Sequence, residues 1–184
     1  MKRMAAVLAL VACSGSMWAQ QGGMATPPAP EKGSVSGMIS EAVAQYKQIK
    51  TIILASAEKM PAENFSFKPV PEVRTYAELF THVAQAQMGM CAAPGSPRPA
   101  PVTATTKEDV INALKASFEL CDAAYEKVTE ANATEVSGAG YMRASQLGKI
   151  YKNVAHDNEM YGTMVVYMRL KGIVPPSTAM RGRM

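Results

Sequence analysis

The chain has two histidines, His82 and His156, and imidazole is a side chain often used for metal binding and for proton transfer near neutral pH. His156 shares a helical stripe with Met160, Met164 and Tyr167, at spacings of three and four residues. His82 lies beside the apolar positions of another helical pattern. Both histidines are therefore expected to be at least partly buried, either as metal ligands or as hydrogen-bonded residues of the core.

Other classes of function find little support in the residues. No local motif joins a nucleophilic serine or cysteine to a histidine and an acid. The formal net charge is +4, but no basic run is interleaved with aromatic residues, so we expect no nucleic-acid partner. The sequence leaves open which small molecule is a partner and whether the protein forms a homodimer.

Four segments with helical periodicity must position the two histidines. They are predicted at about 35–59, 75–92, 105–128 and 145–172. Thr75 with Glu78, and Thr105 with Glu108, have the spacing of capping boxes, in which the two side chains satisfy free backbone amides at a helix start. These pairs predict where the second and third helices begin.

The last helix has a signal at each end, with Ser145 as N-cap and Gly172 in the left-handed position that ends a helix. Its inward stripe is predicted to contain Leu147, Tyr151, Val154, Tyr161, Val165 and Met168. Four helices without a strand pattern predict an all-α fold, a four-helix bundle of antiparallel type. It forms one domain over 34–177, followed by a tail at 178–184.

Two long stretches of the chain resemble the DinB-like family. Residues 153–177, NVAHDNEMYGTMVVYMRLKGIVPPS, are similar to that family's last helix, which carries a segment of the form AHDNEHYG...RLKGIVPPS. Residues 60–87, MPAENFSFKPVPEVRTYAELFTHVAQAQ, resemble its first interhelical loop and second helix. The resemblance covers most of the chain from about 34 to 177, and it implies a four-helix bundle of DinB-like type.

The resemblance also implies a set of metal ligands. It places His82 and His156 at two positions of a three-histidine site that suits zinc or nickel, and the third position, a histidine in the family, is Met160 here. A thioether is a weak ligand for zinc, so the incomplete set predicts a weak or lost divalent-metal site. Asp157 or Glu159 could compensate as a carboxylate ligand, although the family has these carboxylates beside its third histidine.

Two classes of function follow from the resemblance. One is a metal-dependent enzyme, similar to the thiol-dependent transferases and isomerases or to hydrolases of the family, with His82 and His156 as ligands. The other is a non-catalytic binding or scaffold module that kept the bundle and lost the metal. A third reading is a copper protein, because two imidazoles and the thioether of Met160 suit Cu(I) and the chain holds fourteen methionines.

The start of the chain predicts export. Residues 1–19 combine a basic beginning with a short apolar run, as an export signal does. Within it, residues 10–13 have the form of a bacterial lipobox, which predicts lipidation at Cys13; the alternative is ordinary cleavage near Ala19. Residues 20–33 are rich in glycine, proline and alanine and read as a disordered leader. We expect a periplasmic protein or a lipoprotein tethered to the membrane only through Cys13.

Two further cysteines, Cys91 and Cys121, remain in the predicted bundle. An even number of cysteines in an exported domain indicates a disulfide, which would close a loop of about thirty residues. The alternative is two separate buried thiols, since free cysteine packs as a small apolar residue.

Overall fold

The computed structural model describes residues 33–93 and 95–181. The helices are α1 (Val35–Lys59), α2 (Tyr76–Cys91), α3 (Lys107–Tyr125), α4 (Gln146–Leu170) and α5 (Pro176–Arg181), with 3-10 turns η1 (Ala62–Asn64) and η2 (Gly140–Met142). Two short strands, β1 (Val136–Ser137) and β2 (Ala144–Ser145), pair antiparallel. The predicted export signal, the lipobox with Cys13 and the leader up to residue 32 lie outside the described residues, as do the last three residues of the tail.

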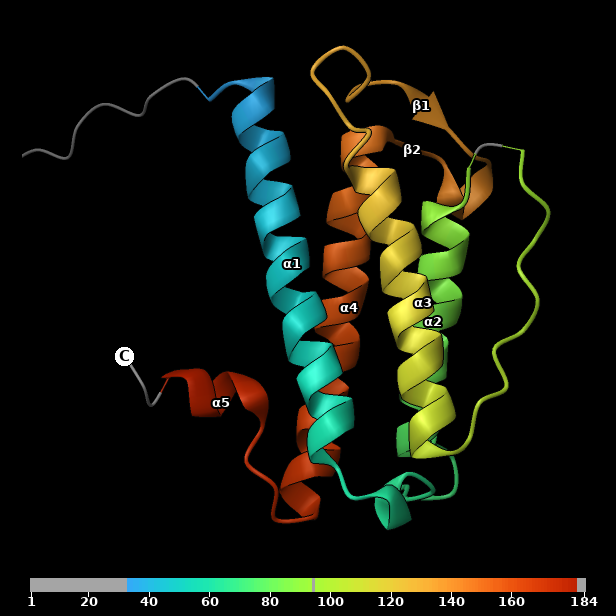
Figure 1. Ribbon diagram of the computed structural model, residues 1–184, viewed down its shortest axis with the longest axis vertical. Coiled ribbons are helices and arrows are strands. Elements are labelled where there is room, and N and C mark those ends of the chain that lie inside the picture. The colour runs from blue at the N-terminus through green and yellow to red at the C-terminus, as the bar shows by residue number, and fades with distance from the viewer. Residues whose placement is uncertain (1–32, 94, 182–184) are drawn as a thin grey trace, which may run out of the picture. The chain divides into compact units, whose positions relative to one another are not determined.

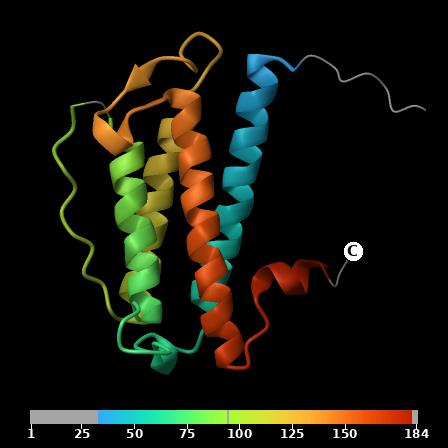
Figure 2. The ribbon, with the colours of Figure 1, turned by 180° about the vertical axis from the view of Figure 1, so that it is seen from behind.

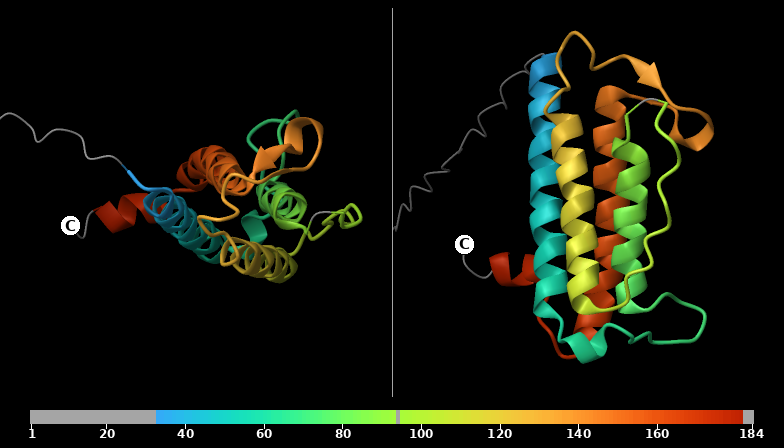
Figure 3. Two further views of the ribbon diagram at one scale, coloured as in Figure 1. Left: turned by 90° about the horizontal axis from the view of Figure 1, so that it is seen from above. Right: turned by 45° about the vertical axis from the view of Figure 1, so that its right-hand side comes forward.

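The four long helices form the predicted bundle. Helix α1 packs against α3 and α4, and α2 packs against the same two helices from the other side (Figures 1 and 3). Both α2 and α3 run from the η1 end of the bundle to the hairpin end, while α1 and α4 run the opposite way. Helices α2 and α3 therefore run parallel to each other, and so do α1 and α4. The prediction of an antiparallel bundle did not include these parallel pairs.

The connection between α2 and α3 explains these directions. Residues 95–106 run back from the hairpin end along the outside of the bundle to the η1 end (Figure 3). The segment contains Pro97, Pro99 and Pro101, and each proline favours an extended conformation in the residue before it. Extended chain advances by about 3.3 Å per residue, against about 1.5 Å in a helix, so a short segment suffices to return along the length of α2.

The helix starts follow the predicted chemistry, with one correction. The Thr75 hydroxyl accepts from the Glu78 amide, and the Glu78 carboxylate accepts from the Thr75 amide at 2.6 Å, so the first capping box is confirmed. The predicted Thr105 box is wrong by one residue, because Thr106 is the N-cap and accepts from the Asp109 amide. Both threonines have a carboxylate three residues later, so the spacing alone could not choose between them.

Both ends of α4 match their predictions. Ser145 caps the start by accepting from the Gly148 amide at 3.0 Å. Gly172 has a φ of 71°, the left-handed conformation in which glycine carries no steric cost. The chain then turns at Pro175 and forms α5, a short helix where the sequence predicted only the end of the domain and its tail.

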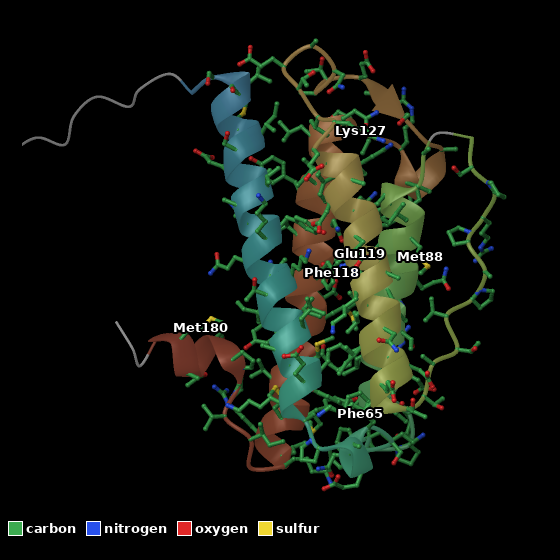
Figure 4. The ribbon with its side chains drawn as sticks, viewed as in Figure 1. Phe65, Met88, Phe118, Glu119, Lys127 and Met180 are labelled. Carbon is green, nitrogen blue, oxygen red and sulfur yellow. A yellow bond between two sulfur atoms is a disulfide. The ribbon has the colours of Figure 1, made fainter. Side chains whose placement is uncertain are left out.

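The core fills the space between the four long helices. Its largest fully buried side chains include Tyr46, Tyr76, Phe65, Phe80, Phe118, Ile53, Leu114 and Ile150. Phe65 closes the η1 end of the bundle, where its ring packs edge-on against Tyr76 (Figure 4). The loop at 60–75 thus belongs to the core through its aromatic side chains.

The inward face of α4 differs in part from the predicted stripe. Val154, Tyr161 and Met168 are buried as predicted, but Tyr151 is 38% exposed and Val165 is only half-buried. The second stripe of the same helix is buried instead, with Met160, Met164 and Tyr167 inside. Because α4 contacts both α1 and α2, it needs an apolar face wider than one stripe. No helix among the described residues is long and apolar enough to cross a membrane.

Candidate functional site

The two histidines meet across the contact between α2 and α4. Figure 2 shows these two helices side by side. The imidazole of His82 on α2 lies beside that of His156 on α4. Their Nε2 atoms lie 3.3 Å apart, and both side chains are half-buried. Two residues 74 positions apart in sequence thus form one pair of imidazoles at the helix contact.

A buried carboxylate orients this pair from within the bundle. Asp157 is fully buried, and its Oδ1 lies 3.3 Å from Nδ1 of His156. With Asp157 ionised, Nδ1 of His156 carries the hydrogen and donates it, which leaves the lone pair on Nε2 facing His82. Ionised Asp157 would therefore favour the tautomer in which His156 presents a basic nitrogen to its partner.

The polar contacts continue from Asp157 into the core. Its Oδ2 accepts from the Gln87 side-chain amide at 2.8 Å, and Oε1 of Gln87 accepts from the Ser117 hydroxyl at 2.7 Å. All three side chains are fully buried. Together they connect α2, α3 and α4 by hydrogen bonds, and each oxygen of Asp157 has a polar partner.

Burial shifts the protonation equilibria of the site. It raises the pKa of Asp157, an effect opposed by hydrogen bonds from His156 and Gln87. It lowers the pKa of His82, with further decreases from the charge of Arg74 and from the neighbouring imidazole of His156. A lowered pKa favours neutral His82 near neutral pH, the form whose nitrogen lone pair can bind a metal.

The positions of the two imidazole nitrogens fit a shared metal ion. Two nitrogen ligands of a tetrahedral zinc ion, each at about 2.0–2.1 Å, lie about 3.3–3.4 Å apart. Nε2 of His82 and Nε2 of His156 have this separation. Within residues 33–93 and 95–181, no set of three His, Cys, Asp or Glu side chains converges, so the strong donors are these two imidazoles.

The remaining candidate ligands are placed as follows. Met160, one helical turn beyond His156, is buried, with 6% of its surface exposed. Glu159 is exposed and close enough to His82 to oppose the decrease in its pKa. Asp157 acts through His156, as the family pattern implied. The donor set therefore fits weak rather than tight binding of zinc or nickel.

One member of the histidine pair, His82, borders an open pocket at the surface. His82 lines an open pocket of about 480 Å³, together with Arg74, Glu78, Thr81 and Gln85. A small ligand in this pocket would contact His82 without unfolding of the bundle.

The predicted disulfide is confirmed. Cys91, the last residue of α2, is bonded to Cys121 of α3, and their Cα atoms lie 5.0 Å apart, within the range that a disulfide requires. The parallel course of α2 and α3 brings the two cysteines to the same level. The Tyr125 hydroxyl, 3.3 Å from Sγ of Cys91, also accepts from the Asn153 side-chain amide at 2.9 Å.

Sequence reasoning missed the buried polar residues that support the site. Gln87 and Asn153 are fully buried, and among the described residues Oδ1 of Asn153 has no hydrogen-bond partner. Gln87 follows Val83 by four residues on the inward stripe of α2, so its spacing was the signal that could have identified it.

These observations define a class of protein. It is a bundle of four long helices with a pair of histidines between the second and the fourth helix. The family model of the DinB superfamily matches residues 45–163, more than half of the chain. The chain belongs to the DinB superfamily.

A solved structure supports the fold. The crystal structure of a DinB-like protein from Bacillus cereus ATCC 10987 is similar with a TM-score of 0.59 and 14% sequence identity, over 77% of this chain and 95% of that chain. Comparison with curated proteins gives no significant match.

Proposed function

We propose that the protein is an exported, non-catalytic member of the DinB superfamily whose histidine pair binds a divalent transition-metal ion weakly. The observation that carries the proposal is the 3.3 Å separation of Nε2 of His82 and Nε2 of His156, combined with a methionine at the third position. The pair keeps the spacing that a shared ion needs, and the site lacks the third strong donor that would hold the ion tightly.

The histidines would hold the ion through their Nε2 atoms, and a bound zinc or nickel ion would supply Lewis acidity at its open positions. Asp157 keeps His156 in the tautomer that binds, and Gln87 and Ser117 keep Asp157 in place. The export expected from residues 1–19, and the tether expected at Cys13, belong to the same proposal.

The competing enzyme function requires a metal ion that stays bound through a reaction cycle. Two imidazoles without a third strong donor do not favour such retention, because catalytic zinc sites use three protein ligands. Copper is the second candidate, favoured by the thioether of Met160 in the turn after His156. The enzyme alternative differs from the proposal in the affinity for zinc or nickel, and the copper alternative differs in the metal that binds.

Metal titration of purified protein, with tags removed and chelator dialysed away, tests the proposal. We expect one weak zinc or nickel ion per chain, and loss of that binding in both His82→Ala and His156→Ala, because each variant leaves a single imidazole. Glu159→Gln is the matched control, since its carboxylate is nearby but is not proposed as a ligand.

Three results would contradict the proposal. They are a stoichiometric zinc or nickel ion that resists dialysis, a site that stays empty at millimolar metal, or weak binding that persists in His82→Ala. A parallel titration with Cu(I) separates the second candidate, because only a copper site would bind Cu(I) tightly and lose affinity in Met160→Leu.

A further inference from the structure

A second pocket lies along the same contact between α2 and α4, toward the hairpin end of the bundle. It has a volume of about 560 Å³ and is lined by residues of α2, of α4, of the connection between α2 and α3, and of the hairpin of β1 and β2. Gln85 lines both this pocket and the one beside His82, so the two meet at that residue. Nothing in the proposed metal site uses the second pocket.

The charges that line this pocket have one sign. Arg98, Lys149 and Lys152 are among its lining residues, and no aspartate or glutamate is. Lys149 donates to the Ser137 hydroxyl at 2.7 Å, and Lys152 donates to the Tyr141 carbonyl and lies over the Tyr141 ring. In the described part of the chain, neither ammonium group forms an ion pair with a carboxylate.

The described lining of the pocket carries positive charges without carboxylates to balance them. Like charges gathered in a partly enclosed space repel one another, and a bound anion relieves that repulsion. Lys149 and Lys152 are also half-buried, which reduces the screening of their charges by solvent. The other walls include Met90, Met142 and Pro97, which offer apolar surface to the rest of a ligand.

We propose that this pocket binds a small organic anion, a phosphate monoester with an apolar body. The phosphate contacts Lys149, Lys152 and Arg98, whose combined charge suits a dianion, and the apolar body lies against Met90 and Met142. This site does not depend on the metal site, because none of its cationic residues contacts His82 or His156.

Phenyl phosphate is the probe, titrated into chelator-treated protein by isothermal calorimetry or by NMR. We expect saturable binding of phenyl phosphate. In the double variant Lys149→Gln with Lys152→Gln its affinity should fall by about tenfold or more, since each lysine would supply a charge-assisted hydrogen bond. Lys47→Gln is the matched control, because Lys47 lies in a groove that also contains Asp122 and Glu126. His82→Ala should bind phenyl phosphate as the parent does, which separates this proposal from the metal site.

Lys152 also donates a hydrogen bond to Tyr141 in the loop between β1 and β2, so its substitution could alter folding. The melting temperatures of its variants are therefore compared with that of the parent. Arg98→Gln provides a variant on an exposed loop that does not threaten folding, and it too should weaken binding. Lack of saturable binding at millimolar phenyl phosphate would overturn the proposal. So would equal binding of neutral benzyl alcohol, or unchanged affinity in both Arg98→Gln and the double lysine variant.

Discussion

Val154→Asp is expected to unfold the bundle at or near room temperature. Val154 is buried on α4, with 7% of its surface exposed, so an aspartate there would place a carboxylate inside the apolar core. Burying an unpaired charge costs at least several kcal/mol, against a total stability of about 5–15 kcal/mol for a typical domain. Circular dichroism during thermal and denaturant unfolding measures the loss.

Val166→Asp is the matched control for that experiment. Val166 lies on the same helix, and 53% of its surface is exposed, so aspartate there should shift the melting temperature by only a few degrees. If both variants melted within a few degrees of the parent, the inward face of α4 would be assigned wrongly. Val165→Asp should lower the melting temperature by an intermediate amount, because Val165 is half-buried.

Loss of the Cys91–Cys121 disulfide should produce the second large effect. The bond closes a loop with a sequence separation of 30 residues, for which the chain-entropy model gives about 3–4 kcal/mol of stability. We expect Cys91→Ala with Cys121→Ala to lower the free energy of unfolding by that amount. Alanine is chosen because both cysteines are buried and a serine hydroxyl there would need a partner.

Two measurements accompany this variant. Reductant should destabilise the parent and leave the double alanine variant unchanged, which separates the bond from other effects of the substitutions. Thiol counting on denatured protein without reductant should find no free thiol from Cys91 or Cys121. Two free thiols per chain, apart from Cys13, would contradict the bond.

The helices themselves could be predicted from the sequence, because their signals are local. The Ser145 N-cap, the Thr75 capping box and the left-handed glycine at 172 each depend on residues within one or two turns. The direction of α3 could not be predicted. The prolines of 92–106 indicate an extended segment, but the choice between crossing the bundle end and returning along its side depends on tertiary packing.

The same distinction applies to the site. The resemblance placed His82 and His156 at ligand positions, and the structure brings their Nε2 atoms together. Cys121 and Cys91 lie at the same height along the bundle because α2 and α3 run parallel. No pattern in the sequence predicts that relative direction. Gln87 and Ser117 were not predicted as partners of Asp157, since spacing along one helix can indicate burial but not which residue of another helix is contacted.

The zinc affinity of Met160→His tests the central claim most directly, that His82 and His156 form a metal site lacking only its third donor. The new imidazole stands four residues after His156, one turn along α4, and should complete a three-histidine site. Asn158→His is the matched control, because a residue two positions away does not share the face of His156. Calorimetric titration should show zinc bound about a hundredfold or more tightly by Met160→His than by the parent, with Asn158→His unchanged. Equal affinity in Met160→His and Asn158→His would mean that the three positions do not converge, and it would contradict the account.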